Sequence, residues 1–288
     1  WASPLNLAVG AAFRDERYAI EAGEPASYIQ GFSPNQYGGY APSGSQVFAG
    51  FRPEAATDDS RTNFGLYADA EASITQKFFA NVAGRFESYS DFGSRLTGKL
   101  AVRYQPSQRW TLRAAASTGF RAPGLSQIHY ASFATNFVFD TATGQPEPVD
   151  FGVFPVASAP AIALGAKPLQ EETAVNFSGG VAVSPASNLT FTADYFYVKI
   201  DDRIILSGLL ATDSIVAILA NAGLTVGGAQ YFANALNTQT QGVDLTGTAS
   251  WSTGGTGVVG VTLGVNYTQN IILSEAPLPP QLVGTGVT

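Results

Sequence analysis

Apolar and polar residues alternate along most of this chain of 288 residues. From 63 to 75, for example, the even positions include Leu66 and Ile74, and the odd positions include Asp69 and Glu71. Because a β-strand projects successive side chains to opposite faces, each such segment has one apolar and one polar face. We predict nine strands of this kind, at about residues 5–20, 63–75, 78–89, 96–104, 109–118, 172–183, 189–202, 239–251 and 257–271.

The polar faces of these strands carry charge in mid-strand, although only 13% of the residues are charged and the mean hydropathy is just +0.08. No run of about 18 apolar residues exists that would predict a spanning helix. A β-barrel in lipid turns its apolar face outward and its polar face toward a wet interior. A soluble β-sandwich also alternates, so periodicity alone leaves both architectures open. The predicted lumen-facing residues are Asp69, Glu71, Arg85, Glu87, Lys99, Arg103, Arg113 and Asp244.

The connections between the predicted strands favour the barrel. Every second link is short, at 76–78, 105–108, 184–188 and 252–256. Three of the four links between them are long, at 21–60, 119–171 and 203–238, whereas 90–94 is short. Outer-membrane barrels have short periplasmic turns and long extracellular loops. Trp1, Trp110 and Trp251 all fall at the short-turn end of a strand, as expected of an aromatic girdle at a membrane interface.

Several classes of function are excluded or disfavoured. The chain has no Cys and one His, His129, so the nitrogen and sulfur ligand clusters of zinc or copper sites cannot be built, and we expect no cofactor. A catalytic triad would need His129, and no Gly-x-Ser-x-Gly surrounds any Ser, so we do not expect an enzyme. A net charge of −7 argues against a nucleic-acid partner.

The long links are rich in aromatic residues among Gly, Pro and Ser, and loops of this length are commonly functional or disordered. We expect a short helix within 209–232, with Asp213 or Ser214 as its N-cap and Gly223 as its stop. The candidate ligand-binding residues of these links are Tyr28, Tyr37, Tyr40, His129, Tyr130, Phe133 and Asn136.

Five motifs in the middle of the chain resemble, in order, those of TonB-dependent outer-membrane receptors. The central one is the strand exit Gly119, Phe120, Arg121, Ala122 and Pro123, where Pro cannot donate to a sheet ladder. Around it lie 87–93 with Lys99, the strand entry 169–173, the strand 194–204 that ends in Asp-Arg-Ile, and the strand 234–244. The chain departs from the family pattern at Gln241, where Arg is common.

The resemblance implies an all-β fold, an antiparallel transmembrane β-barrel segment of about nine strands out of an expected 22. Residues 1–288 would then be a partial barrel domain, without the N-terminal plug domain and the final strands. The implied function is TonB-linked uptake of a scarce nutrient, such as an iron chelate, cobalamin or an oligosaccharide, at the cell outer membrane. Implied partners are the plug domain, the TonB complex, the small-molecule ligand and the lipid bilayer. The alternatives are a passive porin-like channel and a soluble all-β binding module.

Overall fold

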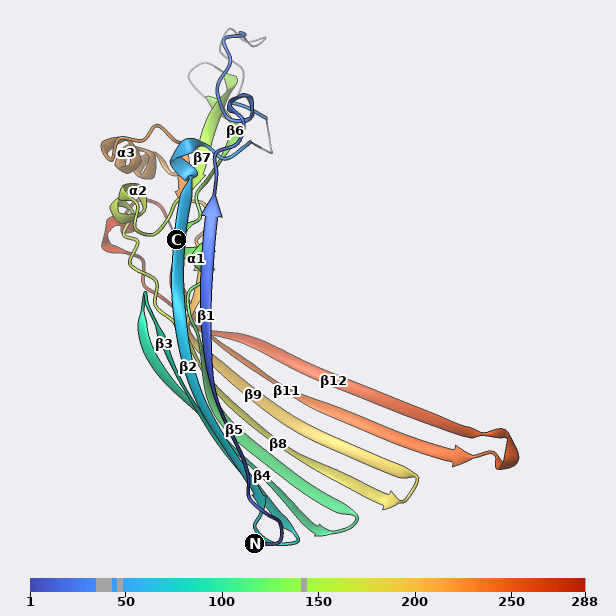
Figure 1. Ribbon diagram of the computed structural model, residues 1–288. Coiled ribbons are helices and arrows are strands. Elements are labelled where there is room, and N and C mark those ends of the chain that lie inside the picture. Colours follow the sequence, from blue (N-terminus) through green and yellow to red (C-terminus); the bar gives the residue numbers. More distant parts are fainter. Residues whose placement is uncertain (35–42, 46–48, 141–143, 288) are drawn as a thin grey trace.

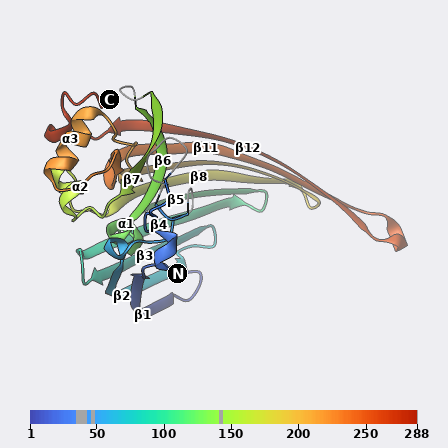
Figure 2. The ribbon, with the colours of Figure 1, turned by 90° about the horizontal axis from the view of Figure 1, so that it is seen from above.

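The computed structural model describes residues 1–34, 43–45, 49–140 and 144–287. Its main element is a nine-stranded antiparallel sheet, which forms a curved wall (Figures 1 and 2). In spatial order the strands are β1 (Asn6–Ile20), β2 (Thr57–Ser73), β3 (Phe78–Tyr89), β4 (Gly93–Ser107), β5 (Trp110–Arg121), β8 (Glu172–Ala186), β9 (Leu189–Leu206), β11 (Phe232–Ser252) and β12 (Val258–Glu275). All nine predicted strands are therefore confirmed.

The strand register keeps one apolar face continuous across the whole sheet. Leu66 of β2 pairs with Phe86 of β3, which in turn pairs with Leu96 of β4. At the far side of the sheet, Leu245 of β11 pairs with Val265 of β12. We call this side of the sheet the apolar face, and the opposite side the polar face.

None of the described residues packs over the middle of the apolar face. Leu66, Val82, Leu100 and Leu263 are 46%, 56%, 54% and 72% exposed. In a β-sandwich these side chains would meet in a dry core. Their exposure excludes the sandwich and leaves this face for lipid, as in a transmembrane barrel.

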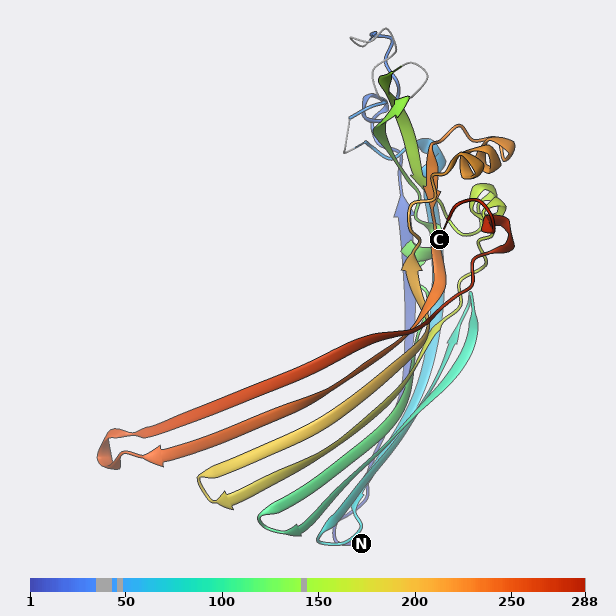
Figure 3. The same cartoon turned by 180° about the vertical axis from the view of Figure 1, so that it is seen from behind.

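The long connections all lie at one end of the sheet, which we call the loop end, together with the short turn 90–92 between β3 and β4. The other short connections lie at the opposite end, which we call the turn end (Figures 1 and 3). The turn-end connections are short: 74–77 joins β2 to β3, for example, and 187–188 joins β8 to β9. Trp110 begins β5 and Trp251 lies next to the 253–257 turn, so both mark the turn end as predicted. No helix among the described residues is long and apolar enough to cross a membrane.

The long links fold into a small unit of their own at the loop end. A three-stranded sheet is formed by β6 (Ser132–Asp140), β7 (Gln145–Val153) and β10 (Gly228–Gln230). Beside it lie α2 (Ala159–Ala163) and α3 (Asp213–Asn221), whereas α1 (Leu125–His129) lies against β1 and β2. The 3-10 turns Pro25–Ser27 and Pro53–Ala55 lie between β1 and β2, and Pro280–Leu282 follows β12. A further 3-10 turn, Gly254–Thr256, lies at the turn end. A hydrophobic core joins the links 122–171 and 207–231 to the segment that follows β12, and Leu164, Ile215 and Leu219 are fully buried in it.

Three details of the sequence prediction are wrong. Treating 119–171 and 203–238 as links without strands missed β6, β7 and β10. The N-cap of α3 is Thr212, whose hydroxyl accepts a hydrogen bond from the Ile215 N–H, rather than Asp213 or Ser214. Several strands also extend further toward the loop end than the alternation predicts. The predicted helix stop is confirmed, because Gly223 follows the C-cap with a φ of +85°, a conformation that glycine adopts without steric cost.

Candidate functional site

The signature Gly119 to Pro123 lies where β5 leaves the sheet at the loop end. The carbonyl oxygen of Pro123 accepts a hydrogen bond of 2.6 Å from Nη1 of Arg61, on β2. Arg61 is only 6% exposed, and its Nε donates to Glu16 at 2.7 Å. A buried guanidinium is costly unless it is paired and hydrogen-bonded. The exit of β5 is therefore tied to β1 and β2 by one buried Arg.

The hairpin motif 87–93 packs on the same signature. Asp91 forms an ion pair of 3.5 Å with Arg61, and the Arg61 guanidinium lies 5.3 Å from the ring centroid of Tyr89. The rings of Tyr89 and Phe92 are 4.5 Å apart, and each lies within about 6.3 Å of the ring of Phe120. Such edge-to-face and tilted ring contacts stabilise the cluster beyond what burial of the rings contributes.

The strand-entry motif 169–173 closes on the other side of the signature. Glu172, at the start of β8, accepts hydrogen bonds from Nε and Nη2 of Arg121 at 2.8 and 2.6 Å. The same carboxylate accepts the backbone N–H of Ile204 at 2.7 Å, and Ile204 belongs to the Asp-Arg-Ile motif of β9. The neighbouring Glu171 pairs with Arg95 of β4.

The last two motifs meet at an irregularity between β9 and β11. Asp202 has a φ of +57°, a left-handed conformation that is uncommon for residues other than glycine. The Asn234 amide donates to the Asp202 carbonyl at 2.6 Å and to the Gln170 carbonyl at 2.9 Å, and Asn237 accepts the Asp202 N–H at 2.9 Å. The register shifts at Asn234, as expected for a bulge that these side chains hold in place.

All five motifs are thus parts of one connected network at the loop end, which we call the motif belt. Its members are Arg61, Tyr89, Asp91, Phe120, Arg121, Pro123, Glu172, Asp202, Ile204 and Asn234. The motifs were named from the sequence, whereas Arg61, which lies outside all of them, was missed. A charged residue in a strand gives no signal in the sequence that it will be buried.

The polar face carries the eight residues predicted to face a lumen. The register from β2 to β5 places seven of these eight residues on one side of the sheet. The pairs Arg113 to Gly180, Gly180 to Asp194 and Asp194 to Asp244 extend that side to β11. That they share one face is therefore a property of the structure. Their contact with a plug domain stays a prediction.

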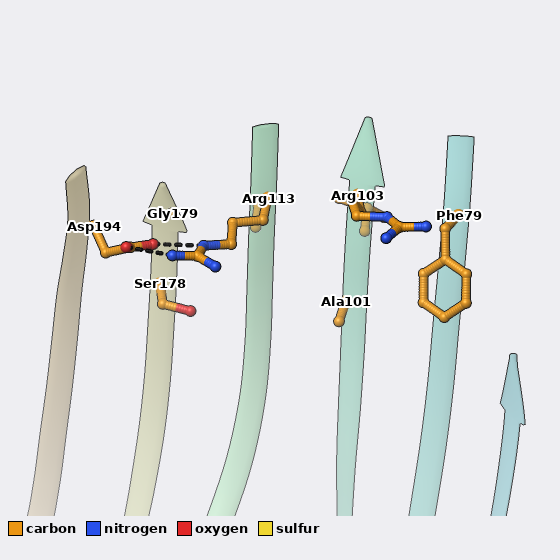
Figure 4. Close-up of a pocket in the computed structure, with 9 residues that line it drawn as sticks. Phe79, Ala101, Arg103, Arg113, Ser178, Gly179 and Asp194 are labelled. Atoms are coloured by element: carbon orange, nitrogen blue, oxygen red, sulfur yellow. Dashed lines mark hydrogen bonds and ion pairs between the residues drawn. The ribbon is translucent and has the colours of Figure 1, made fainter. Parts of the chain in front are cut away.

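A shallow hollow of about 300 Å³ lies on the polar face toward the turn end, across β3 to β9 (Figure 4). On one side of it, Arg113 reaches across β8 and donates to Asp194 at 2.7 Å. The pair crosses the backbone at Gly180, where a Cβ would collide with the Asp194 carboxylate. On the other side, the Arg103 guanidinium lies 5.4 Å from the ring centroid of Phe79. The hollow therefore presents two guanidinium groups above small residues such as Ala101 and Ser178.

The predicted ligand-binding residues of the loops lie in two different places. His129, at the end of α1, contacts Asp59 of β2 through Nδ1 at 3.1 Å, and the Tyr130 ring lies edge-on to Phe51 at 6.2 Å. Phe133 and Asn136 lie on β6 instead. The ring of Phe133 packs on Phe154 at 5.5 Å and on the guanidinium of Arg52 at 4.7 Å, so it supports the loop core.

Of the remaining predicted residues, Asn136 is exposed on β6 and Tyr28 ends the 3-10 turn Pro25–Ser27. Tyr37 and Tyr40 lie outside the described residues. Among the residues that the structure describes, no group of three His, Asp or Glu side chains is placed to hold a metal ion.

A scan of protein families matches residues 3–286 to the model described as TonB dependent receptor-like, beta-barrel. The chain belongs to this family. Family members are receptors and transporters with an outer-membrane β-barrel, so the wall described above is a segment of such a barrel. No curated protein matches the chain in sequence.

Solved receptor structures share the fold. The siderophore receptor PirA from Pseudomonas aeruginosa matches with a TM-score of 0.54 and 15% identity, over 76% of this chain and 36% of that chain. A mutant of the ferric enterobactin receptor PfeA from the same organism gives 0.58 and 15%, over 92% and 32%. The iron transporter FrpB from Neisseria meningitidis gives 0.52 and 16%, over 94% and 34%. The chain thus spans about a third of the length of the receptors that it matches.

Proposed function

We propose that this chain forms wall and ligand-binding loops of an outer-membrane receptor that takes up a scarce nutrient with energy from the TonB complex. The main support for this function is that the two faces of the sheet differ from each other, and so do its two ends. One face is apolar and uncovered, the other is charged, and the long links are folded together at one end only. A bilayer on one side, a wet lumen on the other and a ligand at the mouth account for all of these features.

The charged face supports a second part of the proposal, a plug domain inside the lumen of the parent receptor. Arg103 has an aromatic contact but no carboxylate partner among the described residues, and it borders the hollow beside Arg113. Such a surface suits polar and water-bridged contacts, which form and release more easily than a packed apolar interface. The nutrient classes that fit the family are an iron chelate, cobalamin or an oligosaccharide.

The test is uptake by cells that carry the parent receptor as their only receptor for the candidate nutrients. We expect accumulation of one labelled nutrient to require both the receptor and a functional TonB complex, and to stop in a strain that lacks TonB. Uptake that continues without TonB, together with leakage of a small hydrophilic dye, would instead identify a passive channel.

The plug contact is tested with Arg103→Ala in the same receptor. We expect faster dye leakage because a guanidinium that holds the plug is lost. Arg109→Ala, at the turn between β4 and β5, is the matched control. Equal leakage of the two variants would contradict a role for Arg103 in holding the plug.

A further inference from the structure

The three long links are strongly acidic. Residues 21–56, 122–171 and 207–231 contain eight Asp or Glu and two Lys or Arg, with His129 taken as neutral. Their net charge of −6 accounts for nearly all of the −7 of the chain. A mouth of one sign of charge attracts ligands of the opposite sign and repels those of its own sign. The loop end is therefore unfavourable for an anionic ligand.

A cavity of about 410 Å³ lies within these links, a size typical of small-molecule sites. All three links line it, at Gln30 from the first, at 147–150 from the second and at 224–227 from the third. Part of its wall is apolar, from residues such as Val149, Val216 and Leu224. Polar residues alternate with the apolar ones around it, so the cavity offers several contacts that can orient a ligand.

These polar groups are hydroxyls, carboxylates and the amide of Gln30. The Thr135 hydroxyl donates to Asp150 at 2.6 Å, and Asp150 also pairs with Arg52. Glu147 has no hydrogen-bond or ion-pair partner within the part of the chain that the structure describes. No Lys or Arg is among the described residues that line the cavity. The cavity thus offers a free carboxylate acceptor and no cation for an anion.

We propose that this cavity binds an uncharged, hydroxyl-rich ligand of the oligosaccharide class and discriminates against anionic iron chelates. The inference rests on the proposed function, because it names the substrate class of the same loops. Sugar hydroxyls donate to the Glu147 carboxylate, and the C–H faces of a sugar ring pack on Val149 and Leu224. An anionic chelate would be repelled by the acidic links and would find no counter-charge at the wall.

The experiment is titration calorimetry on the full-length parent receptor in detergent micelles. The probes are a panel of uncharged oligosaccharides built from glucose, galactose, mannose or xylose units, and ferric enterobactin as the anionic chelate. We expect at least one oligosaccharide to bind and ferric enterobactin not to bind. Binding of ferric enterobactin alone, or of no oligosaccharide in the panel, overturns the inference.

Three variants locate the site. Glu147→Ala should weaken oligosaccharide binding at least tenfold, and Ala220→Trp, which fills the cavity from α3, should abolish it. Glu54→Ala is the matched control, because this carboxylate is exposed in the same unit but does not line the cavity. Glu147 and Ala220 are exposed, so neither variant should prevent folding. Equal affinity of wild type and both cavity variants overturns the assignment to this cavity.

Failure of the inference is distinguishable from failure of the proposed function. Oligosaccharide binding without TonB-dependent uptake contradicts the proposed transport but leaves the ligand class intact. TonB-dependent uptake of ferric enterobactin, without binding of any oligosaccharide, supports the proposed transport and contradicts the ligand class.

Discussion

Replacing Glu172 by Ala is the sharpest test of the motif belt. Glu172 is 7% exposed and accepts three hydrogen bonds, two from Arg121 and one from the Ile204 N–H. Ile204 is itself 6% exposed, so its N–H would lose its partner in a dry environment. An orphaned buried N–H costs about 1–3 kcal/mol, and a hydrogen bond to a charged group contributes about 1.5–3 kcal/mol.

The Arg121 side chain is about half exposed, and water will replace part of what it loses. We therefore discount the charged contribution and expect the loop ends of β8 and β9 to open with about 3–4 kcal/mol less free energy than in the wild type. At about 1.4 kcal/mol per factor of ten, this corresponds to roughly a hundredfold to a thousandfold faster amide hydrogen exchange.

The assay is hydrogen exchange of the parent receptor in micelles, followed at the peptide that contains Ile204. Glu172→Gln keeps an acceptor oxygen for the Ile204 N–H and should give a smaller increase. Lys199→Ala removes an exposed ion pair with Asp201 on the same strand and should change the free energy of opening by less than about 1 kcal/mol. Unchanged exchange at Ile204 in Glu172→Ala would refute the claim that this carboxylate fastens the strand ends.

Three other changes test the remaining parts of the structure. Leu100→Arg, on the apolar face in mid-strand, should lower the free energy of unfolding in lipid vesicles by about 2–4 kcal/mol. Ala101→Arg, on the polar face, should change this free energy by less than about 1 kcal/mol. Equal costs of the two variants would contradict the lipid-facing assignment. Arg61→Ala should accelerate hydrogen exchange around Pro123, because a buried guanidinium with several partners is lost; unchanged protection there would contradict the belt. Burial raises the pKa of the Tyr231 phenol, so the loop core should keep its stability below about pH 10 and lose stability as the pH rises further. The variant Tyr231→Phe should remove this pH dependence. Amide hydrogen exchange of α3 between about pH 9 and 11 measures the stability of the wild type and of the variant.

The turn ends of the strands were predictable and their loop ends were not, for a physical reason. Alternation of apolar and polar residues arises where the two faces of a strand meet different surroundings, which here are lipid on one face and water on the other. The strand β2 begins at Thr57, yet the alternation begins only at 63, because 57–62 is polar on both faces. The strand β11 also begins earlier than predicted, at Phe232 rather than 239. In this part its register with β9 shifts at a bulge, which interrupts the alternation.

The small sheet of the loops escaped prediction for a different reason. The strand β7 contains Pro146 and Pro148, which cannot donate to a sheet ladder and are expected only at edges or outside strands. Its pairing with β6 and β10 depends on a core built from links that lie far apart in the sequence. Such tertiary support leaves no periodic trace in a single segment.

The motifs that identify the family differ from the residues that would recognise a ligand. Gly119 to Pro123 and the other described members of the motif belt contact each other, and none of them lines the loop cavity. The belt fastens the strand ends whatever the links above it contain, so the links are free to differ between receptors. An identity of 15% to a ferric enterobactin receptor therefore informs the wall and leaves the ligand open. Glu147 and the other acidic residues of the links that lie outside the family motifs are the residues to change if the ligand preference is to be altered.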